Sequence, residues 1–455
     1  MRFYRKESER LEKIESFVRS SLPSLGVNKK QEITRLLYEI AKRENTPPEK
    51  IIEDVHIKSF DAVKEALLKR RFPYAYINDE ALKLYLPKLK LDKNSALNLK
   101  KTKFYPGNIF VEKSARRSSL VQRFKGSFPK ARFSEIASLK DHLKTRKNFT
   151  IETYNKRRDT VFITLENYDF FKKCPCTKKA VGCGYHIFNL SFGCLFECTY
   201  CYLQEYTNSH GLIFPANIDK FFQVFSSYKK PRMRIGTGEF SDSLMLDHIT
   251  QYSLPIIDFF KKHPDVRFEF KTKSVNIDNL LKTDHAGNIV VAWSFNPQRI
   301  IDENEFFTPA LNERIRSAKK CVEAGYKISA HFDPVVYFNG WEKEYRKVID
   351  SLFSAIKPKD IAWISIGTLR FNPRVKQVIE TRFPGNKILD EELILGYDNK
   401  LRYPYKIRHH IYKSMLEKLF KHSKKLSIYL CMEDVSMWRN LPKLTNPTRS
   451  FCQLK

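Results

Sequence analysis

The chain has 455 residues, of which 42% are hydrophobic, so it can form two or three domains or one large barrel with an appendage. This apolar content argues against global disorder. Lysine and arginine outnumber aspartate and glutamate by 82 to 51, which gives a formal net charge of +31 and favours a polyanionic partner such as DNA or RNA. Nine cysteines in a chain of this length do not suggest a disulfide framework.

The N-terminal sequence has no apolar segment followed by a cleavage site, and no run of about eighteen apolar residues occurs. We therefore expect no signal peptide and no membrane span. A reducing cytoplasm is the expected location of the protein.

Residues 1–100 are predicted to form a helical accessory region. Ile33, Leu37 and Ile40 fall on one face of a helix that begins near Asn28. We expect a small docking module without chemistry of its own.

Residues 105–170 are predicted to form an α/β segment that flanks the main domain. The apolar runs in this segment predict three strands and a helix, at 108–112, 132–136 and 161–165 and at 118–128, respectively.

Residues 171–440 alternate between predicted strands and helices, which indicates a parallel sheet with its active site at the carboxyl ends of the strands. The six predicted strands are 232–235, 266–271, 289–293, 328–332, 361–366 and 426–430, and the helices are 218–226, 248–262, 311–325 and 345–355. We predict an α/β fold with a partial (β/α)6 TIM barrel, and residues 441–455 as a tail.

Three cysteines, Cys194, Cys198 and Cys201, fall within eight residues, with an aromatic on each side of the last one. Three closely spaced thiolates can hold three irons of a [4Fe–4S] cube and leave the fourth iron open for a small ligand. This C-x3-C-x2-C motif resembles that of radical S-adenosylmethionine (SAM) enzymes. The alternative is a zinc site with Cys183 or His186 as the fourth ligand.

Cys174, Cys176 and Cys183 precede this motif and suggest a second cluster or metal site. Only three cysteines are present there, at irregular spacing, so the sequence alone favours no second site.

A glycine-rich turn follows the predicted strand at 232–235 and carries Glu239, Ser241 and Asp242. Glycines at a strand end let a ligand approach the backbone. Glu239 can accept hydrogen bonds from an ammonium group, such as the amino group of SAM.

The next predicted strands also end in polar residues, which a barrel would point into its interior. These residues are Lys271, Lys273, Ser294, Asn296, His331 and Asp333.

Basic and aromatic residues alternate between Leu401 and His410, where Arg402, Lys406 and Arg408 could neutralise phosphates while tyrosines stack on exposed bases. The alternative is a solvated helix face.

The segment Asn189–Gln204 closely resembles the cluster motif of spore photoproduct lyase, a radical SAM family that repairs a methylene-bridged thymine dimer in DNA. The likeness covers roughly residues 105–440. Further matching stretches are Ser241-Asp242 with Asp247-His248, Phe270-Lys-Thr-Lys273, Ser294-Phe-Asn296, Ala324-Gly-Tyr-Lys327, Asp333-Pro334 with Gly340-Trp341, and Arg382-Phe-Pro384.

The resemblance implies a partial TIM barrel and a [4Fe–4S] cluster on the three motif cysteines, with SAM on the open iron. It implies SAM contacts from Ser241, Asp242, Lys273 and Ser294. Tyr200 and Tyr202 are the candidates for the family's radical relay, and Arg402 to Arg408 lie where a basic hairpin would grip DNA.

One departure concerns the position before Phe240-Ser241-Asp242. The family has a cysteine there that donates a hydrogen atom to the product radical, whereas this chain has Glu239. A carboxylate cannot replace the thiol, because its O–H bond is far stronger.

The leading prediction is a radical SAM enzyme that acts on nucleic acid, with a damaged pyrimidine in DNA as the foremost substrate. An electron donor such as a flavodoxin or a ferredoxin is expected. The alternatives are a radical SAM enzyme acting on RNA or a modified nucleotide, and a non-catalytic metal-containing protein that binds nucleic acid.

Overall fold

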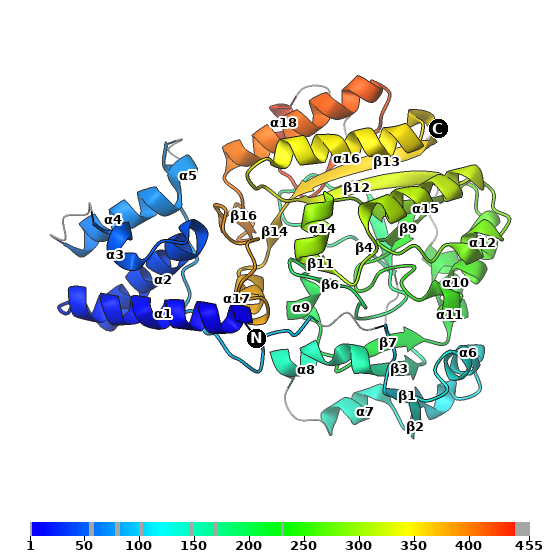
Figure 1. The fold of residues 1–455 in the computed structure, drawn as a ribbon. Coiled ribbons are helices and arrows are strands. Elements are labelled where there is room, and N and C mark those ends of the chain that lie inside the picture. Colours follow the sequence, from blue (N-terminus) through cyan, green and yellow to red (C-terminus); the bar gives the residue numbers. More distant parts are fainter. Residues whose placement is uncertain are drawn as a thin grey trace.

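A curled sheet of eight strands forms the centre of the protein, in the order β17-β13-β12-β10-β9-β8-β5-β4 (Figure 1). The structure, a computed structural model, describes residues 2–53, 59–77, 82–99, 103–145, 149–166, 171–228 and 232–441. Neighbouring strands are parallel except for the edge strand β4, which is antiparallel to β5. The strands are β4 Phe171–Lys173, β5 Tyr185–Phe188, β8 Arg234–Thr237, β9 Arg267–Thr272, β10 Ile289–Ser294, β12 Lys327–Val335, β13 Ile361–Thr368 and β17 Ile428–Leu430.

The partial TIM barrel is thus confirmed. The order of its parallel strands follows the chain, and all six predicted strands are present with small shifts at their ends. The prediction of six units missed β5, because this short strand contains His186 and lacks the apolar run of a central strand. In contrast, β10 reads Ile-Val-Val-Ala-Trp-Ser, the continuous apolar pattern of a strand that is buried on both faces.

Helices cover the outer face of this sheet (Figure 1). The predicted helix at 248–262 is instead two helices, because Gln251 adopts a left-handed conformation with φ of 51°. The helices described in this part of the chain are α9 Leu203–Tyr206, α10 Ile218–Tyr228, α11 Asp247–Thr250, α12 Ser253–Lys261, α13 Asp278–Leu281, α14 Gln298–Asn304, α15 Leu311–Glu323, α16 Trp341–Ala355, α17 Pro373–Arg382, α18 Tyr405–His422 and α19 Val435–Arg439. A 3-10 turn, η3, spans Pro358–Asp360.

A second parallel sheet, in the order β2-β1-β3-β7, lies against the barrel. Its last strand, β7, follows the cysteine motif in sequence, so this sheet combines residues on both sides of the predicted boundary at residue 170. Its elements are β1 Asn108–Glu112, η1 Lys113–Ala115, α6 Ser119–Ser127, β2 Arg132–Ile136, α7 Leu139–Lys144, α8 Ile151–Asn155, η2 Arg157–Asp159, β3 Thr160–Thr164 and β7 Leu212–Pro215.

Two smaller sheets complete the described strands. β6 Glu197–Cys198 pairs antiparallel with β11 Glu305–Phe306. β14 Arg370–Phe371, β16 Leu401–Arg402 and β15 Ile394–Leu395 form a three-stranded antiparallel sheet.

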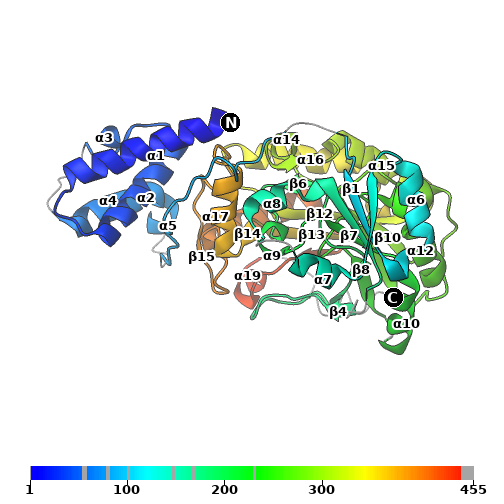
Figure 2. The same ribbon diagram turned by 90° about the horizontal axis from the view of Figure 1, so that it is seen from below.

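The N-terminal helices form a lobe beside the barrel (Figure 1, Figure 2). They share a hydrophobic cluster of their own that includes Ile33, Leu37 and Ile40, as the sequence pattern predicts. The helices are α1 Arg2–Ser21, α2 Val27–Glu44, α3 Pro48–Ile51, α4 Phe60–Arg71 and α5 Pro73–Ile77. Their assignment to a separate domain stays a prediction, and all but Leu441 of the predicted tail lies outside the described residues.

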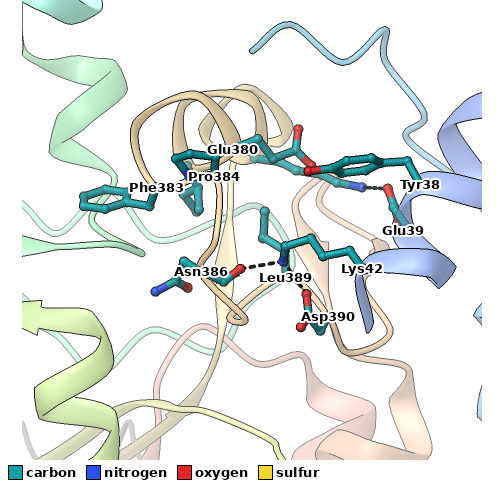
Figure 3. A pocket seen from close by; sticks show the side chains of 11 residues that line it. Tyr38, Glu39, Lys42, Glu380, Phe383, Pro384, Asn386, Leu389 and Asp390 are labelled. Carbon is teal, nitrogen blue, oxygen red and sulfur yellow. Dashed lines mark hydrogen bonds and ion pairs between the residues drawn. The ribbon is translucent and has the colours of Figure 1, made fainter. Parts of the chain in front are cut away.

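Buried charges join this lobe to α17. The carboxylate of Glu39 accepts hydrogen bonds from Arg35, Arg71 and Lys376, at 2.7–2.9 Å. Figure 3 shows Lys42 donating across the interface to the carbonyl of Asn386, 2.6 Å away, and to the carboxylate of Asp390. A cavity of about 20 Å³ lies between α2 and residues 376–390. This volume of about 20 Å³ is too small for a ligand.

Among the described residues, no helix is both long enough and apolar enough to span a bilayer.

We expect Glu39→Ala to lower the free energy of unfolding by about 3–5 kcal/mol, because it leaves buried cations without their shared carboxylate. Urea unfolding followed by circular dichroism measures this loss. The matched control is Glu9→Ala, which removes an exposed ion pair with Arg5 and should cost less than about 1 kcal/mol. Equal effects of the two variants would contradict this account of the interface.

Candidate active site

The cysteine motif occupies the loop that leaves the carboxyl end of β5. Gly193 precedes Cys194 with φ of +83°, and a Cβ at this position would lie 2.9 Å from the side chain of Leu212 on β7. Glycine is therefore required for both the backbone conformation and the close approach. Cys198 is the last residue of β6 and pairs with Glu305 of β11. This antiparallel pair ties the cysteine loop to the segment that follows α14.

A buried carboxylate, that of Glu197, fixes this loop from inside. It forms ion pairs with Arg157 of η2 and with Arg382 at the end of α17, the latter at 2.8 Å. Arg157 also donates to the carbonyl oxygens of Cys194 and Phe196, each at 3.2 Å. Burial alone would raise the pKa of Glu197, but the two guanidinium groups hold it below its ordinary value, so the carboxylate is charged.

Further hydrogen bonds complete the support of the loop. Thr199 bonds to Asn304 through its backbone, at 2.9 Å, and through its hydroxyl, at 2.8 Å. Gln204 donates to the carbonyl of Thr199 at 2.6 Å and accepts from Arg382 at 2.8 Å. The loop is thus held by three separate segments of the chain, at Arg157, at Asn304 with Glu305, and at Arg382.

The three motif thiols are half-buried and free of disulfides. Burial raises the pKa of the Cys194 thiol to about 12 and also raises the pKa values of Cys198 and Cys201. The thiols are therefore neutral without a metal and would release protons on binding one.

The spacing of these thiols bears on the zinc alternative. Across the described ranges, no three His, Cys, Asp or Glu side chains converge closely enough to hold a single metal ion. The ligands of one tetrahedral zinc lie about 4 Å apart, whereas a cube spreads its thiolates over different irons. The donor set therefore fits an iron–sulfur cluster better than zinc.

The loop after β8 lies directly beside the cysteine loop. The hydroxyl of Ser191 donates to that of Ser241 at 2.5 Å. Asp242 accepts from the hydroxyl of Thr272, from the backbone of Leu244 and from the backbone of Lys273 at 2.6–3.0 Å. Both of its oxygens are thus used within the protein, and Asp242 positions this loop.

Glu239 stands at the end of the same turn. Its carboxylate pairs with Lys172 of β4 at 2.8 Å, and its backbone carbonyl accepts the hydroxyl of Tyr202. The carboxylate side chain is 10% exposed, whereas that of Lys172 is 39% exposed, so a ligand ammonium could take the place of the lysine.

Tyr200 belongs to a buried polar group at the ends of β9 and β10. Its hydroxyl donates to Glu305, which also pairs with Arg314 at 2.6 Å. The ammonium of Lys273 lies 5.9 Å from the centre of the Tyr200 ring. Burial opposes ionisation of Glu305, but Arg314 and Lys273 lower its pKa to about 2.

Lys273 also interacts electrostatically with Cys198, and Asp242 with Cys194, so these predicted SAM contacts lie near the thiols. Ser294 lies at the end of the neighbouring strand β10, with its carbonyl held by Arg314 at 2.9 Å. Ligand binding by these residues stays a prediction.

His331 is instead part of the packed barrel interior. Its ring lies 2.6 Å from a carboxylate oxygen of Glu269, which also pairs with Arg234 at 2.8 Å. Asp333 is paired with Arg370 at 2.8 Å. These side chains already have partners within the protein and are structural.

The basic stretch differs from its prediction. Arg402 is fully buried and pairs with Asp398 at 2.6 Å, and Arg408 is 5% exposed and pairs with Glu433 at 3.2 Å. This placement contradicts a phosphate contact by either arginine. Lys406, on the first turn of α18, is exposed.

The comparisons with known proteins agree with this geometry. The family model described as "Spore photoproduct lyase" matches residues 104–434, which is more than half of the chain. The chain belongs to the spore photoproduct lyase family. It is accordingly a radical SAM enzyme of the lyase class, with a [4Fe–4S] cluster and SAM as cofactors.

Individual relatives show the extent of the match. Spore photoproduct lyase of Bacillus subtilis (strain 168) is 28% identical over 302 residues, which cover 64% of this chain and 86% of that protein. The protein of the same name from Geobacillus sp. (strain Y412MC61) is 30% identical over 210 residues, covering 44% and 62%.

Solved structures share the fold. A spore photoproduct lyase complexed with dinucleoside spore photoproduct has a TM-score of 0.61 at 23% identity, covering 72% of this chain and all of that one. A double mutant of spore photoproduct lyase with bound AdoMet and dinucleoside spore photoproduct has a TM-score of 0.61 at 23% identity, covering 73% and 100%. The N-terminal helical lobe lies outside the family match.

Sequence reasoning missed Arg157 and Glu305, which support the motif from outside it. Glu197 gave a usable signal, because a carboxylate between two cysteines of a buried motif requires a cationic partner. The sequence does not reveal which arginines supply that partner.

We expect Glu197→Gln to lower the free energy of unfolding by about 3 kcal/mol or more, and to reduce the iron bound per chain, because two buried guanidinium groups lose their counter-charge. Iron analysis after anaerobic reconstitution and urea unfolding measure the two effects. Glu152→Gln, which alters an exposed ion pair with Lys156, should change neither. Full iron content in Glu197→Gln would contradict the role of this carboxylate.

Proposed function

We propose that the protein reverts a covalently linked pyrimidine dimer in DNA by radical SAM chemistry. The observation that supports this proposal most directly is the family match over residues 104–434. The matched range includes the cysteine motif that follows β5. The net charge of +31 is consistent with a DNA substrate.

In this proposal Cys194, Cys198 and Cys201 would ligate the cluster. With SAM bound, the cluster would supply a 5′-deoxyadenosyl radical on one-electron reduction. The amide oxygen of Asn189, at the start of the loop, is buried without a hydrogen-bond partner, which is consistent with a polar ligand nearby.

The surrounding side chains carry charges that complement the amino and carboxylate groups of SAM. Lys273 can pair with the carboxylate of SAM, since Glu305 and Cys198 raise the pKa of Lys273 despite its burial. Glu239 can accept the ammonium of SAM in place of Lys172. The hydroxyls of Ser241 and Ser294 lie on the two flanking strand ends, and Asp242 holds the first of these loops.

Tyr200 and Tyr202 flank the last motif cysteine and are the proposed radical relay. Burial and Glu305 raise the pKa of Tyr200, so its phenol is neutral and can pass its proton to that carboxylate on oxidation. Tyr202 donates to a backbone carbonyl instead and is 38% exposed, which places it nearer to a substrate surface.

A damaged dimer inside a duplex has to leave the stack to reach this end of the barrel, and damage lowers the energetic cost of that step. With Arg402 and Arg408 buried, exposed basic side chains such as Lys406 are the proposed phosphate contacts. A flavodoxin or ferredoxin in a reducing cytoplasm is the proposed electron donor.

A second candidate is an RNA or modified-nucleotide substrate with the same radical chemistry. Glu239 favours it, because the carboxylate, paired with Lys172, occupies the position where the family's thiol is expected.

The decisive assay supplies the reconstituted protein with dithionite, SAM and an oligonucleotide that contains a methylene-bridged thymine dimer. We expect 5′-deoxyadenosine to form and thymine to be restored, and Cys198→Ala to abolish both. Deoxyadenosine without restored thymine would favour the second candidate. No deoxyadenosine from the intact protein would overturn the radical SAM assignment of this chain.

We expect Tyr202→Phe to retain cleavage of SAM but to lower turnover of the lesion by about tenfold or more, because the relay loses its phenol. Product yield per 5′-deoxyadenosine measures this uncoupling. Tyr206→Phe is the matched control, since Tyr206 packs edge-on against Tyr202 at 5.7 Å and is more exposed. An unchanged product ratio in Tyr202→Phe would exclude Tyr202 from the relay.

A further inference from the structure

The loop between β4 and β5 bridges the two edges of the open barrel, and we call this bridge the seam contact. Its Val181 donates a backbone hydrogen bond of 2.8 Å to Glu433, and Ala180 forms an antiparallel bridge with Asp434. The hydroxyl of Thr177 contacts the sulfur of Met432 at 3.8 Å. The loop thereby joins the edge formed by β4 and β5 to the segment that follows β17, the strand at the other edge.

This contact gathers four cysteines from two distant parts of the chain. The loop carries Cys174, Cys176 and Cys183, and Cys431 directly follows β17. The backbone of Cys176 donates to the carbonyl of Cys174 at 2.7 Å, and the Val181–Glu433 bond lies two residues from both Cys183 and Cys431. Cys176 interacts electrostatically with Cys183 and Cys431, and Cys183 with Cys431. All four are half-buried and free of disulfides. The sequence offered only three clustered thiols, and the fold brings a fourth.

The surroundings of these thiols are cationic. Arg370 donates to the sulfur of Cys431 at 3.3 Å and is oriented by Asp333 at 2.8 Å. Lys271 interacts electrostatically with Cys174 and Cys431, and Lys400, which donates to Thr177 at 3.0 Å, lies near Cys431. Such groups stabilise the negative charge of a thiolate-ligated cluster, and hydrogen bonds to its sulfurs tune its potential.

We propose that Cys174, Cys176, Cys183 and Cys431 bind a second iron–sulfur cluster. Four cysteines are the usual ligand set of [2Fe–2S] and [4Fe–4S] clusters. A zinc ion held by the same four thiolates is disfavoured, because the described side chains include no three ligands at single-ion distances.

The second cluster would lie beside the first site. Cys174 interacts electrostatically with Glu239 and with Tyr202, which follows the last motif cysteine. The two ligand sets share no residue, so this inference stands whether or not the proposed substrate is correct.

The test starts from the full chain with the substitutions Cys194→Ala, Cys198→Ala and Cys201→Ala, which remove the first ligand set. After anaerobic reconstitution, we expect this triple variant to retain about two to four irons, with matching sulfide, and an iron–sulfur EPR signal on reduction. Adding Cys176→Ala and Cys431→Ala should remove that iron and signal. Adding Cys321→Ala instead, at a buried cysteine of α15, should leave both unchanged.

The intact protein should accordingly bind about six to eight irons per chain, of which about four belong to the first site. A triple variant that stays folded by circular dichroism but binds no iron would overturn the proposal. One zinc in place of iron and sulfide, or iron that persists after Cys176→Ala and Cys431→Ala, would overturn it as well.

Discussion

The ion-pair group of Glu197 with Arg157 and Arg382 is the interaction on which the candidate active site depends. Three fully buried charged side chains are costly to desolvate, and they are tolerable only because the carboxylate meets both guanidinium groups. Arg157 also donates to the carbonyls of Cys194 and Phe196, so this group fixes the backbone of the cysteine loop directly. The cysteine loop is therefore supported by charges whose partners all lie within the protein.

The same group connects the layers of the protein. Arg382 accepts a backbone hydrogen bond from Leu97 at 2.9 Å and donates to Asn155 at 2.7 Å. It ends α17, the helix whose Lys376 forms an ion pair with Glu39 of the N-terminal lobe. One helix thus contacts both the cysteine loop and the lobe that the family match leaves out.

Much of the fold could be predicted because the decisive patterns are local. β1 and β2 have the predicted bounds, and the cysteine spacing by itself favours an iron–sulfur cluster over zinc. Burial of charge was the main failure, since Arg402 and Arg408 read as a basic surface and are instead neutralised by Asp398 and Glu433. A composition count cannot distinguish a solvated arginine from one whose partner lies elsewhere in the chain.

Long-range pairing was equally hidden. β5 is short and partly polar, so only its neighbours β4 and β8 in the sheet define it. Cys431 had no assigned role until the seam contact placed it beside the cysteines of the β4–β5 loop. Residues whose partners lie far along the chain leave no pattern in the local sequence. Residues that act together within one loop leave a recognisable spacing.

The seam contact also sets the order of events during synthesis. Val181 can form its hydrogen bond only after Glu433, about 250 residues later, has been made. At a ribosomal rate of roughly 5–20 residues per second, that delay is about 10–50 s. The proposed set of four thiols is therefore complete only after Cys431 has been made, whereas Cys194, Cys198 and Cys201 emerge more than 200 residues earlier.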